Sequence, residues 1–357
     1  MRKGLILIVS FLKKSHGEHR VASKTVAVVY LARPKTGINY IRNFIKSYIR
    51  YRAGYSHDLI ILGKGLADPK DLFIKINHKF ISIPDIGFDI HAYINFANHS
   101  NYEYILFCNT YSQIESDDWL LKMMGHAVNP KIGIVGCTGS YESLYNSSRL
   151  MQKVNWLINI KKIKVNKEFE MRYGFFIDLL RDSEGKNYRL LIRILIRKFY
   201  KFIQVQSVEY GPELDLEFSA MWANASNVGG PLAWLYKFPE FPNPHIRTTA
   251  FLIKRSLLSE LNFSIPESKE ACAIFESGYE GLTKKIIALN LGVCVVGADG
   301  LAYSVNDWQK SNTFRSKEEE NVLISDNHVR GWRETSSSKR SLIHELTWGN
   351  LMLGKDK

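Results

Sequence analysis

Residues 101–120 read NYEYILFCNTYSQIESDDWL and contain the clearest structural signal of this sequence. The apolar run Tyr104–Cys108 is short and continuous, which is typical of a strand buried on both faces of a sheet. Small and polar residues follow it, and Asp117 and Asp118 then precede an apolar turn, a pattern that predicts the start of a helix. In open α/β sheets, ligands bind just beyond the carboxyl ends of the strands. The stretch therefore predicts a buried central strand that ends at a ligand-binding edge.

Strand and helix patterns alternate on both sides of this stretch. Further strands are expected at 25–31, 58–62, 80–83, from 132 onward, at 246–253 and at 292–296. Segments with helical apolar spacing occur at 38–52, 90–99 and 254–261. In the first of these, the predicted apolar face comprises Ile38, Ile41, Phe44, Ile45, Tyr48 and Ile49. Repeated strand–helix–strand units favour a parallel, doubly wound sheet.

Composition limits the class of protein. The chain has 357 residues, of which 45% are hydrophobic and 12% aromatic, enough for one large α/β domain or two smaller ones. A net charge of +13 favours anionic partners, namely nucleotide diphosphates, phospholipid headgroups or nucleic acid. The four cysteines are far apart and form no C-x-x-C pair, which indicates a reduced, intracellular protein. We expect no membrane-spanning segment, because no stretch is long and charge-free enough.

The middle of the chain differs in composition from both flanks. Residues 151–205 carry 13 Lys and Arg against 5 Asp and Glu, a net +8. Within them, 188–205 has an apolar helical pattern in which basic residues recur every four positions from Arg189 to Lys201. Two interpretations stay open. The helix either lies on an anionic membrane surface, with its arginines reaching the phosphates, or packs on the domain with one solvated stripe.

Residues 101–120 resemble the central strand of GT-A-type glycosyltransferases of the broad family-2 kind. In that family an aspartate-x-aspartate box follows the strand, whereas here Asn109-Thr110-Tyr111 stands at its place and the diagnostic acids are absent. Other passages resemble the same family in the same order. Asp85 to Asn95 is similar to its N-x-G…A-x-N segment, 246–261 to its acceptor-side strand and helix, and 275–285 to its ED-x-x-L-x-x-R helix.

The resemblance covers about residues 25–145 and 240–305. It implies an α/β fold, a GT-A-like (Rossmann-like) and mostly parallel central sheet with helices on both faces. It also implies a division of the chain into an N-terminal extension (1–24), a GT-A-like domain (25–305) with a basic helical insertion (about 151–238), and a C-terminal arm (306–357).

The activity implied by the resemblance is sugar transfer from a nucleotide-diphosphate sugar to a saccharide or lipid-linked acceptor. Glu276 or Glu280 would be the base that takes the proton of the acceptor hydroxyl. The residues implied to bind the nucleotide sugar are Arg33, Pro34, Asp85, Asn109, Tyr111 and Arg247. The use of Mg²⁺ or Mn²⁺ stays open: Asn109 and Tyr111 are weak substitutes for carboxylates, and the spacing does not decide whether a nearby acid holds a metal, the candidates being Asp85, Asp89, Asp117 and Asp118. Arg247 and His245 are the alternative means of neutralising the diphosphate.

The same resemblance implies a bacterial protein of surface-polysaccharide or lipopolysaccharide assembly, cytoplasmic and peripheral to the inner face of the plasma membrane. A second hypothesis is a GT-A-like scaffold that binds a partner without catalysis, for which the missing acids are the main argument. Nucleic-acid binding is not expected, because the positive charge is concentrated in an apolar helical region and the sequence has no recognisable nucleic-acid module.

Overall fold

The computed structural model describes residues 25–67, 70–164, 167, 169, 173, 210–227 and 229–349. The chain divides into two compact units. The first comprises Met1–Tyr141 and Pro244–Thr335, and the second Glu142–Asn243 and Ser336–Lys357. The expected N-terminal extension and the basic helix predicted at 188–205 lie outside the described residues.

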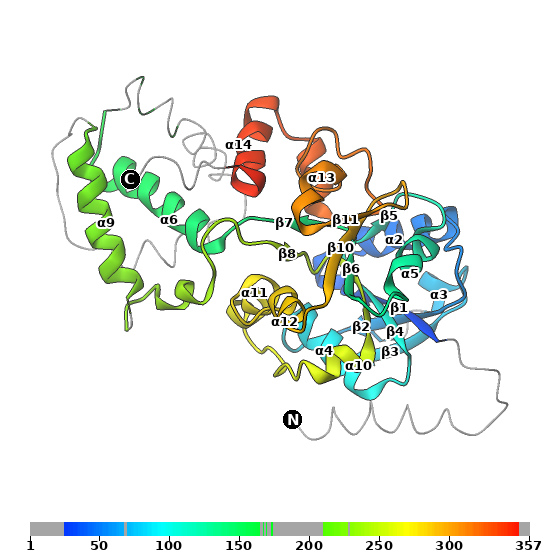
Figure 1. Ribbon diagram of the computed structural model, residues 1–357. Coiled ribbons are helices and arrows are strands. Elements are labelled where there is room, and N and C mark those ends of the chain that lie inside the picture. Colours follow the sequence, from blue (N-terminus) through cyan, green and yellow to red (C-terminus); the bar gives the residue numbers. More distant parts are fainter. Residues whose placement is uncertain are drawn as a thin grey trace. The chain divides into compact units, whose positions relative to one another are not determined.

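An eight-stranded sheet forms the centre of the first unit (Figure 1), with the order β11-β10-β6-β9-β4-β1-β2-β3. Its strands are β1 (Val26–Ala32), β2 (Asp58–Lys64), β3 (Lys79–Ile83), β4 (Tyr104–Cys108), β6 (Ile132–Gly136), β9 (Ala250–Lys254), β10 (Gly292–Val296) and β11 (Ala302–Ser304). Neighbouring strands are parallel except at β9, which is antiparallel to both β4 and β6, and at β11. This confirms the predicted α/β fold with a mostly parallel sheet.

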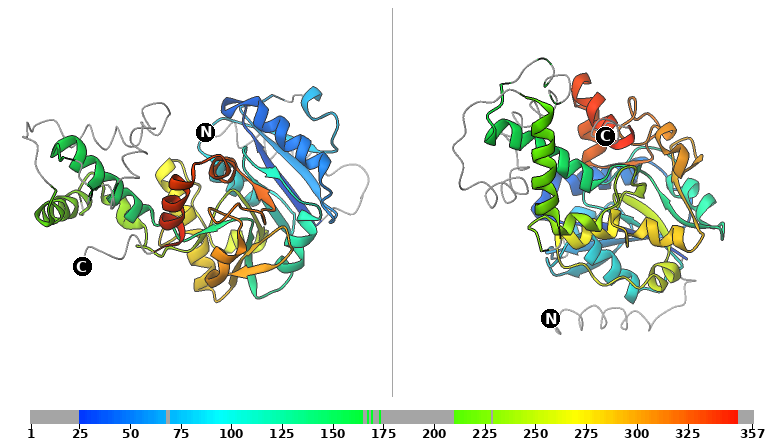
Figure 2. Two further views of the ribbon diagram at one scale, coloured as in Figure 1. Left: turned by 90° about the horizontal axis from the view of Figure 1, so that it is seen from above. Right: turned by 60° about the vertical axis from the view of Figure 1, so that its left-hand side comes forward.

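Helices cover both faces of this sheet. They are α2 (Ile38–Arg50), α4 (Asp89–His99), α5 (Trp119–Ala127), α10 (Arg255–Glu260), α11 (Lys269–Ser277) and α12 (Leu282–Ala288). Side chains of a strand point alternately to its two faces. Leu106 and Cys108 of β4 pack with residues of α2 and α5, whereas Phe107 between them stacks on Tyr93 of α4. The left view of Figure 2 shows α2, in blue, lying over the first strands.

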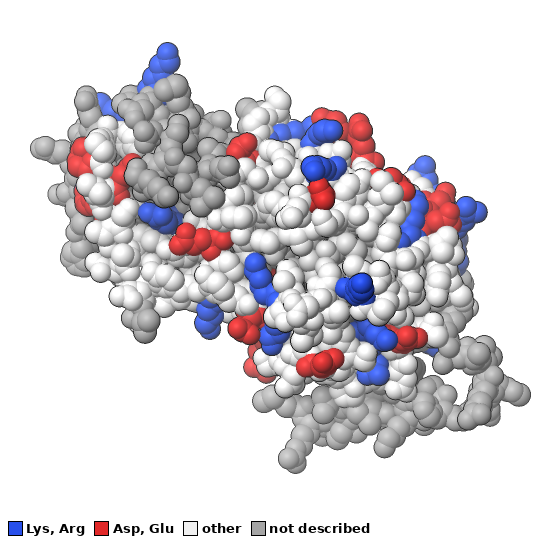
Figure 3. All heavy atoms as spheres, viewed as in Figure 1, with Lys and Arg blue, Asp and Glu red and all other residues white. Residues whose placement is uncertain are grey.

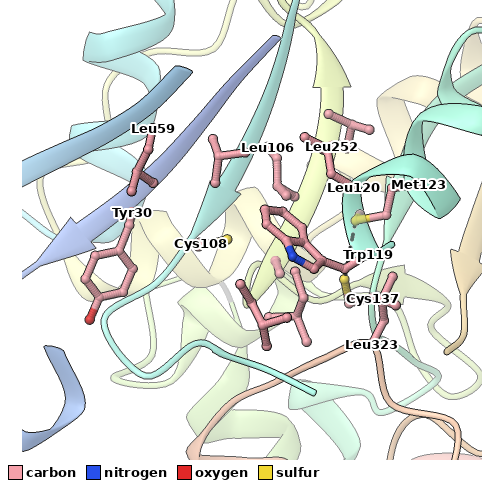
Figure 4. Close-up of a cluster of buried hydrophobic side chains, with 14 of the residues drawn as sticks. Tyr30, Leu59, Leu106, Cys108, Trp119, Leu120, Met123, Cys137, Leu252 and Leu323 are labelled. Atoms are coloured by element: carbon pink, nitrogen blue, oxygen red, sulfur yellow. Dashed lines mark hydrogen bonds between the residues drawn. The ribbon is translucent and has the colours of Figure 1, made fainter. Parts of the chain in front are cut away.

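Trp119 lies in the centre of the larger core (Figure 4) and is fully buried. Cys108 and Cys137 belong to the same cluster, and the Cys137 thiol lies 3.7 Å from the sulfur of Met123. All four cysteines are free, and burial raises the pKa of Cys108 to about 12. The buried thiols therefore act as protonated packing groups.

Two sequence predictions need correction. Ile38 and Ile49 were expected on the apolar face of α2 but are 37% and 53% exposed, because they lie at the margin of the apolar stripe, whose members Ile41, Phe44, Ile45 and Tyr48 pack on the core. The single strand expected at 246–253 is two strands, β8 (His245–Ile246) and β9. They are separate because β8 pairs with the short strand β7 (Gly139–Ser140) and the chain then turns before joining the central sheet.

Short elements complete the first unit. They are the 3-10 helices η1 (Pro34–Thr36) and η4 (Val305–Ser311), helix α3 (Lys70–Phe73), the strand pair β5 (Gln113–Ile114) and β12 (Ile324–Ser325), and helix α13 (Asn327–Arg333). Because β12 pairs with β5, part of the expected C-terminal arm is joined to the loop that follows β4.

The second unit has a helical core of its own. Its elements are α6 (Leu144–Asn155), the π-helical segment η2 (Trp156–Ile160), α9 (Pro212–Ser226), the 3-10 helix η3 (Ala233–Lys237) and α14 (Ser337–Trp348). Aromatic side chains such as Trp156, Phe218 and Trp222 fill it. The buried Lys153 is paired with the partly exposed Asp215, with Nζ 3.0 Å from Oδ1. None of the described helices has both the length and the apolar character needed to cross a membrane.

Charged side chains of both signs share the surface. On the face shown in Figure 3, the described Lys and Arg residues are interspersed with Asp and Glu. Mixed charge of this kind is typical of an ordinary solvated surface.

Candidate functional site

The order of the strands reverses between β1 and β4. From β1 the chain continues to β2 and β3 on one side, and it then returns to β4, which pairs in parallel with the other side of β1. The ends of the two strands are joined at the carboxyl edge of the sheet, where the Tyr30 hydroxyl donates to the Thr110 carbonyl and the Thr110 hydroxyl to the Leu31 carbonyl, each at 2.9 Å. Open α/β sheets bind their ligands at such a switch point. Here Arg33 follows β1 and Asn109 follows β4.

On the β1 side, two cations share one carboxylate. Arg33 Nε lies 2.9 Å from Asp85 Oδ1, and Lys35 Nζ lies 2.7 Å from Asp85 Oδ2. The hydrogen bond from Lys35, followed by the contacts from Arg33, holds the pKa of Asp85 below its ordinary value. Pro34 is the first residue of η1, where its fixed φ favours the helical turn. Arg33 directly precedes this turn and Lys35 lies within it. Lys35 remains 78% exposed, so this ion pair is open to solvent.

The end of β2 carries a buried cation. Lys64 is 1% exposed, and its Nζ donates to the carbonyl oxygen of Gly87 at 2.6 Å. Burial lowers the pKa of Lys64 and raises that of Asp89, while the attraction between the two charges opposes both shifts. Gly87 has φ +67°, and a Cβ there would lie 2.7 Å from the His91 ring. The Gly-Lys-Gly sequence at this strand end thus braces the loop before α4.

On the β4 side, Asn109 shapes its own turn. Its Oδ1 accepts hydrogen bonds from the Tyr111 amide at 2.9 Å and from the Ser112 hydroxyl at 3.2 Å. This is the turn that Asn side chains commonly form with the following backbone. Tyr111 is fixed in turn, since its carbonyl accepts from Arg330 Nη2 at 3.0 Å and its ring meets that of Tyr40 edge-on. The Asn109 side chain, which stands where the resemblance leads one to expect an aspartate, therefore uses its oxygen to stabilise its own turn.

Because β9 is antiparallel, its beginning lies at the same edge as the end of β4. The Thr249 carbonyl accepts from the Asn109 amide at 3.1 Å. The neighbouring Thr248 donates to Glu276 through its amide at 2.8 Å and through its hydroxyl. Burial by itself would raise the pKa of Glu276, but the charges of His245 and Arg247 and the Thr248 hydrogen bonds outweigh it and lower the pKa. Glu276 is thus an oriented carboxylate that is ionised at neutral pH.

Asp326 joins α13 to the start of β9. It is 1% exposed, and its Oδ1 accepts from the amides of His328 and Val329 at 2.9 and 3.0 Å, which caps the helix. Its Oδ2 accepts from the Thr249 hydroxyl at 2.7 Å and lies 3.4 Å from Arg247 Nη2. Burial would raise the pKa of Asp326, but Arg247 and the other donors hold it at about 2. Sequence reasoning missed this residue, although an Asp before a helical segment is a capping signal.

Arg247 interacts with both of these carboxylates, since it pairs with Asp326 and its charge acts on Glu276. Its guanidinium carbon is 4.1 Å from the centroid of the Phe314 ring, which fits a cation–π contact. Its Nη1 is buried and has no hydrogen-bond partner among the described residues.

Most of the residues implied by the resemblance meet at this edge. Arg33, Pro34 and Asp85 are together beside β1. Across the switch point, the charge of Arg33 opposes the rise in the pKa of Tyr111. The group beside β4 and β9 comprises Asn109, Tyr111, Arg247 and Glu276. The single helix expected at 275–285 is wrong: α11 ends at Ser277 and α12 begins at Leu282. Glu280 is exposed in the turn between them and is not hydrogen-bonded to this group.

The acids at this edge do not fit a divalent metal ion, because among the described residues only Asp89 is not already bound by donors or cations of the chain. Among the residues that the structure describes, no three His, Cys, Asp or Glu side chains converge as metal ligands. Asp85 is bound on both oxygens by cations, and Asp326 accepts on both oxygens from donors of the chain. Asn109 offers one neutral oxygen that already accepts two hydrogen bonds.

No protein-family model matches the sequence, and no curated protein matches it either. Among solved structures, it is similar to a mannosyltransferase from Pyrobaculum calidifontis in complex with GDP-Man and Mn²⁺ (13% identity, TM-score 0.28, 42% of this chain and 48% of that chain). It is also similar to mouse xyloside xylosyltransferase 1 in its apo form (9% identity, TM-score 0.36, 77% and 85%). A third is glucosyl-3-phosphoglycerate synthase from Mycobacterium tuberculosis with Mn²⁺, UDP and glucosyl-3-phosphoglycerate (16% identity, TM-score 0.26, 43% and 55%). The chain spans about half the length of the first and third of these proteins, and all three likenesses are weak.

Proposed function

We propose that the first unit is a glycosyltransferase that moves a sugar from a nucleotide-diphosphate sugar to a saccharide or lipid-linked acceptor. The proposal rests on the position of oppositely charged groups at one edge of the sheet, on the segments that follow β1 and precede β9. Arg33 and Lys35 lie beside β1, and the oriented carboxylate Glu276 lies beside the start of β9. The order of the sequence motifs that resemble GT-A-type enzymes supports the same activity.

The cations and the carboxylate suit the two ends of such a reaction. When the bond between the anomeric carbon and the diphosphate breaks, its electron pair leaves on the diphosphate, and nearby cations stabilise that charge. The acceptor oxygen forms the new bond to the anomeric carbon, and its proton passes to Glu276. A lowered pKa makes Glu276 a modest base, so proton transfer is favourable only as the acceptor oxygen becomes acidic during attack.

The wider setting of the proposal comes from the resemblance and from composition. A role in surface-polysaccharide or lipopolysaccharide assembly fits the family-2-like motif order. Work at the inner face of the plasma membrane fits the net charge of +13 and the basic segment at 188–205.

A second candidate is a GT-A-like scaffold that binds a nucleotide or a saccharide without catalysis. It is favoured by Asn109, which stands in the place of a carboxylate and uses its oxygen within its own turn. The two candidates differ in turnover, so an assay of sugar transfer separates them.

The test is a panel of nucleotide sugars assayed for transfer and for slow hydrolysis. We expect the Glu276→Gln variant to lose about a hundredfold or more in turnover, because general-base catalysis typically contributes that much. Glu270→Gln is the matched control, since Glu270 is exposed on the same helix α11. Equal turnover of the two variants would remove Glu276 as the base. Binding of a nucleotide sugar without turnover by the unmodified protein would favour the scaffold.

A further inference from the structure

We propose that the site holds the diphosphate of its donor without a divalent cation, through the side chains of Arg33 and Lys35. This inference rests on the proposed function and deepens it. Asp85 presents the two cations at the carboxyl end of β1, where the strand order reverses. The ligand that they would recognise is a nucleoside diphosphate bound as the free anion.

The first argument is that, among the described residues, three of the four carboxylates nearby (Asp85, Glu276 and Asp326, but not Asp89) are already bound by donors or cations of the chain. Each oxygen of Asp326 accepts from donors of the chain, and Glu276 accepts from two groups of Thr248. Moving either carboxylate onto a metal ion would leave buried donors of the chain unpaired, which is unfavourable. Asp85 is more exposed, but both of its oxygens bind cations that would repel a metal ion.

The second argument is the balance of charge beside β1. One carboxylate, Asp85, faces two cations, so the cluster has a net positive charge. The ion pair engages only Nε of Arg33, which leaves the two terminal nitrogens as donors for the oxygens of a phosphate. An arginine can bind phosphate oxygens in a bidentate manner, and a lysine adds a mobile point charge.

The third argument is position and access. The side chains of Arg33 and Lys35 are 27% and 78% exposed, so an anion can reach them from solvent. The charge of Arg33 also acts on Asp89 at the start of α4 and on Tyr111 after β4. Arg33 therefore lies at the switch point, where the architecture of the sheet places a ligand. Lys64 adds positive charge at the end of the neighbouring strand β2, but its side chain is too buried to touch a ligand.

The test is calorimetric titration of the full-length protein with UDP and with GDP, in EDTA and again with Mn²⁺. We expect the tighter of the two nucleotides to bind in EDTA with a dissociation constant within about threefold of its value in Mn²⁺. Lys35→Met and Arg33→Met should each weaken binding in EDTA by about tenfold or more, because each removes a charge-assisted hydrogen bond. Lys46→Met is the matched control, since Lys46 is an exposed lysine on α2.

The outcomes separate this inference from the proposed function. Binding in EDTA that both cation variants weaken supports the inference. Binding that requires Mn²⁺, or that neither variant weakens, overturns the inference and leaves the transferase proposal standing. Absence of binding in both conditions overturns the proposed function itself. Lys35→Met decides the matter if Arg33→Met does not fold, because the exposed Lys35 side chain contributes little to packing.

Discussion

Asp85 and Asp326 both hold an arginine at the same edge of the sheet, but in different surroundings. The Asp85 side chain is 15% exposed, and one of its two cationic partners, Lys35, is mostly in solvent. The Asp326 side chain is 1% exposed and accepts from two backbone amides, a hydroxyl and Arg247. The first arrangement can exchange partners when an anion arrives. The second fixes the start of β9 and the start of α13, and thereby the place of Thr248 and Glu276.

The largest difference between the two aspartates should be in stability. We expect Asp326→Ala to lower the free energy of unfolding by about 3–5 kcal/mol, because it removes the buried carboxylate that pairs with the largely buried Arg247 and caps α13. Asp85→Ala should cost no more than about 1 kcal/mol, since partly exposed ion pairs contribute little. Urea denaturation of both variants measures this. Equal losses would mean that the two sites are not of different kinds.

A second test concerns the pH dependence of the free energy of unfolding that arises from Glu319. This residue lies in the segment that carries Phe314, the ring that contacts Arg247. Burial raises the pKa of Glu319 to about 8, against opposing contacts from the Arg315 amide and the Arg333 charge. Between pH values of about 4.5 and 8, the folded protein keeps a proton on Glu319 that the unfolded chain has lost. The unfolded state then binds fewer protons, so stability falls as the pH rises through this window.

The Glu319→Gln variant has no such proton to lose. Its free energy of unfolding should decline less than that of the unmodified protein between pH values of about 5 and 8, because the linked protonation is gone. Denaturation at several pH values within this range gives the two slopes. Parallel slopes would show that Glu319 ionises normally and that its burial is relieved in solution.

The smallest expected effect on the free energy of unfolding comes from a substitution that should change nucleotide affinity alone. Lys35→Met should weaken nucleotide binding while leaving the urea midpoint unchanged, because the Lys35 side chain is mostly solvated. A shift of the midpoint comparable to that of Asp326→Ala would contradict the view that the Asp85 cluster is open.

The sequence was most informative where structure depends on neighbours in the chain. The run Tyr104–Cys108 predicted a buried strand correctly, and Asp117 and Asp118 correctly marked the start of α5. These signals are local, since burial and helix starts depend on the residues next to them.

What the sequence could not indicate depends on contacts between distant segments. The bond from Thr249 to Asp326 joins residues 77 positions apart, and the antiparallel direction of β9 follows from its pairing with β4 and β6. The role of Asn109 was also hidden, because its two hydrogen bonds require the turn that it forms. For the candidate site, the sequence supplied candidate residues but not their partners, which depend on contacts between distant segments.

The most direct test of the central claim is to locate the bound nucleotide. Hydrogen exchange measured with and without a saturating nucleoside diphosphate should show slower exchange in residues 33–37, 85–89 and 109–113, the loops that meet at the switch point between β1 and β4. Protection confined to other parts of the chain, with these three loops unchanged, would contradict the account.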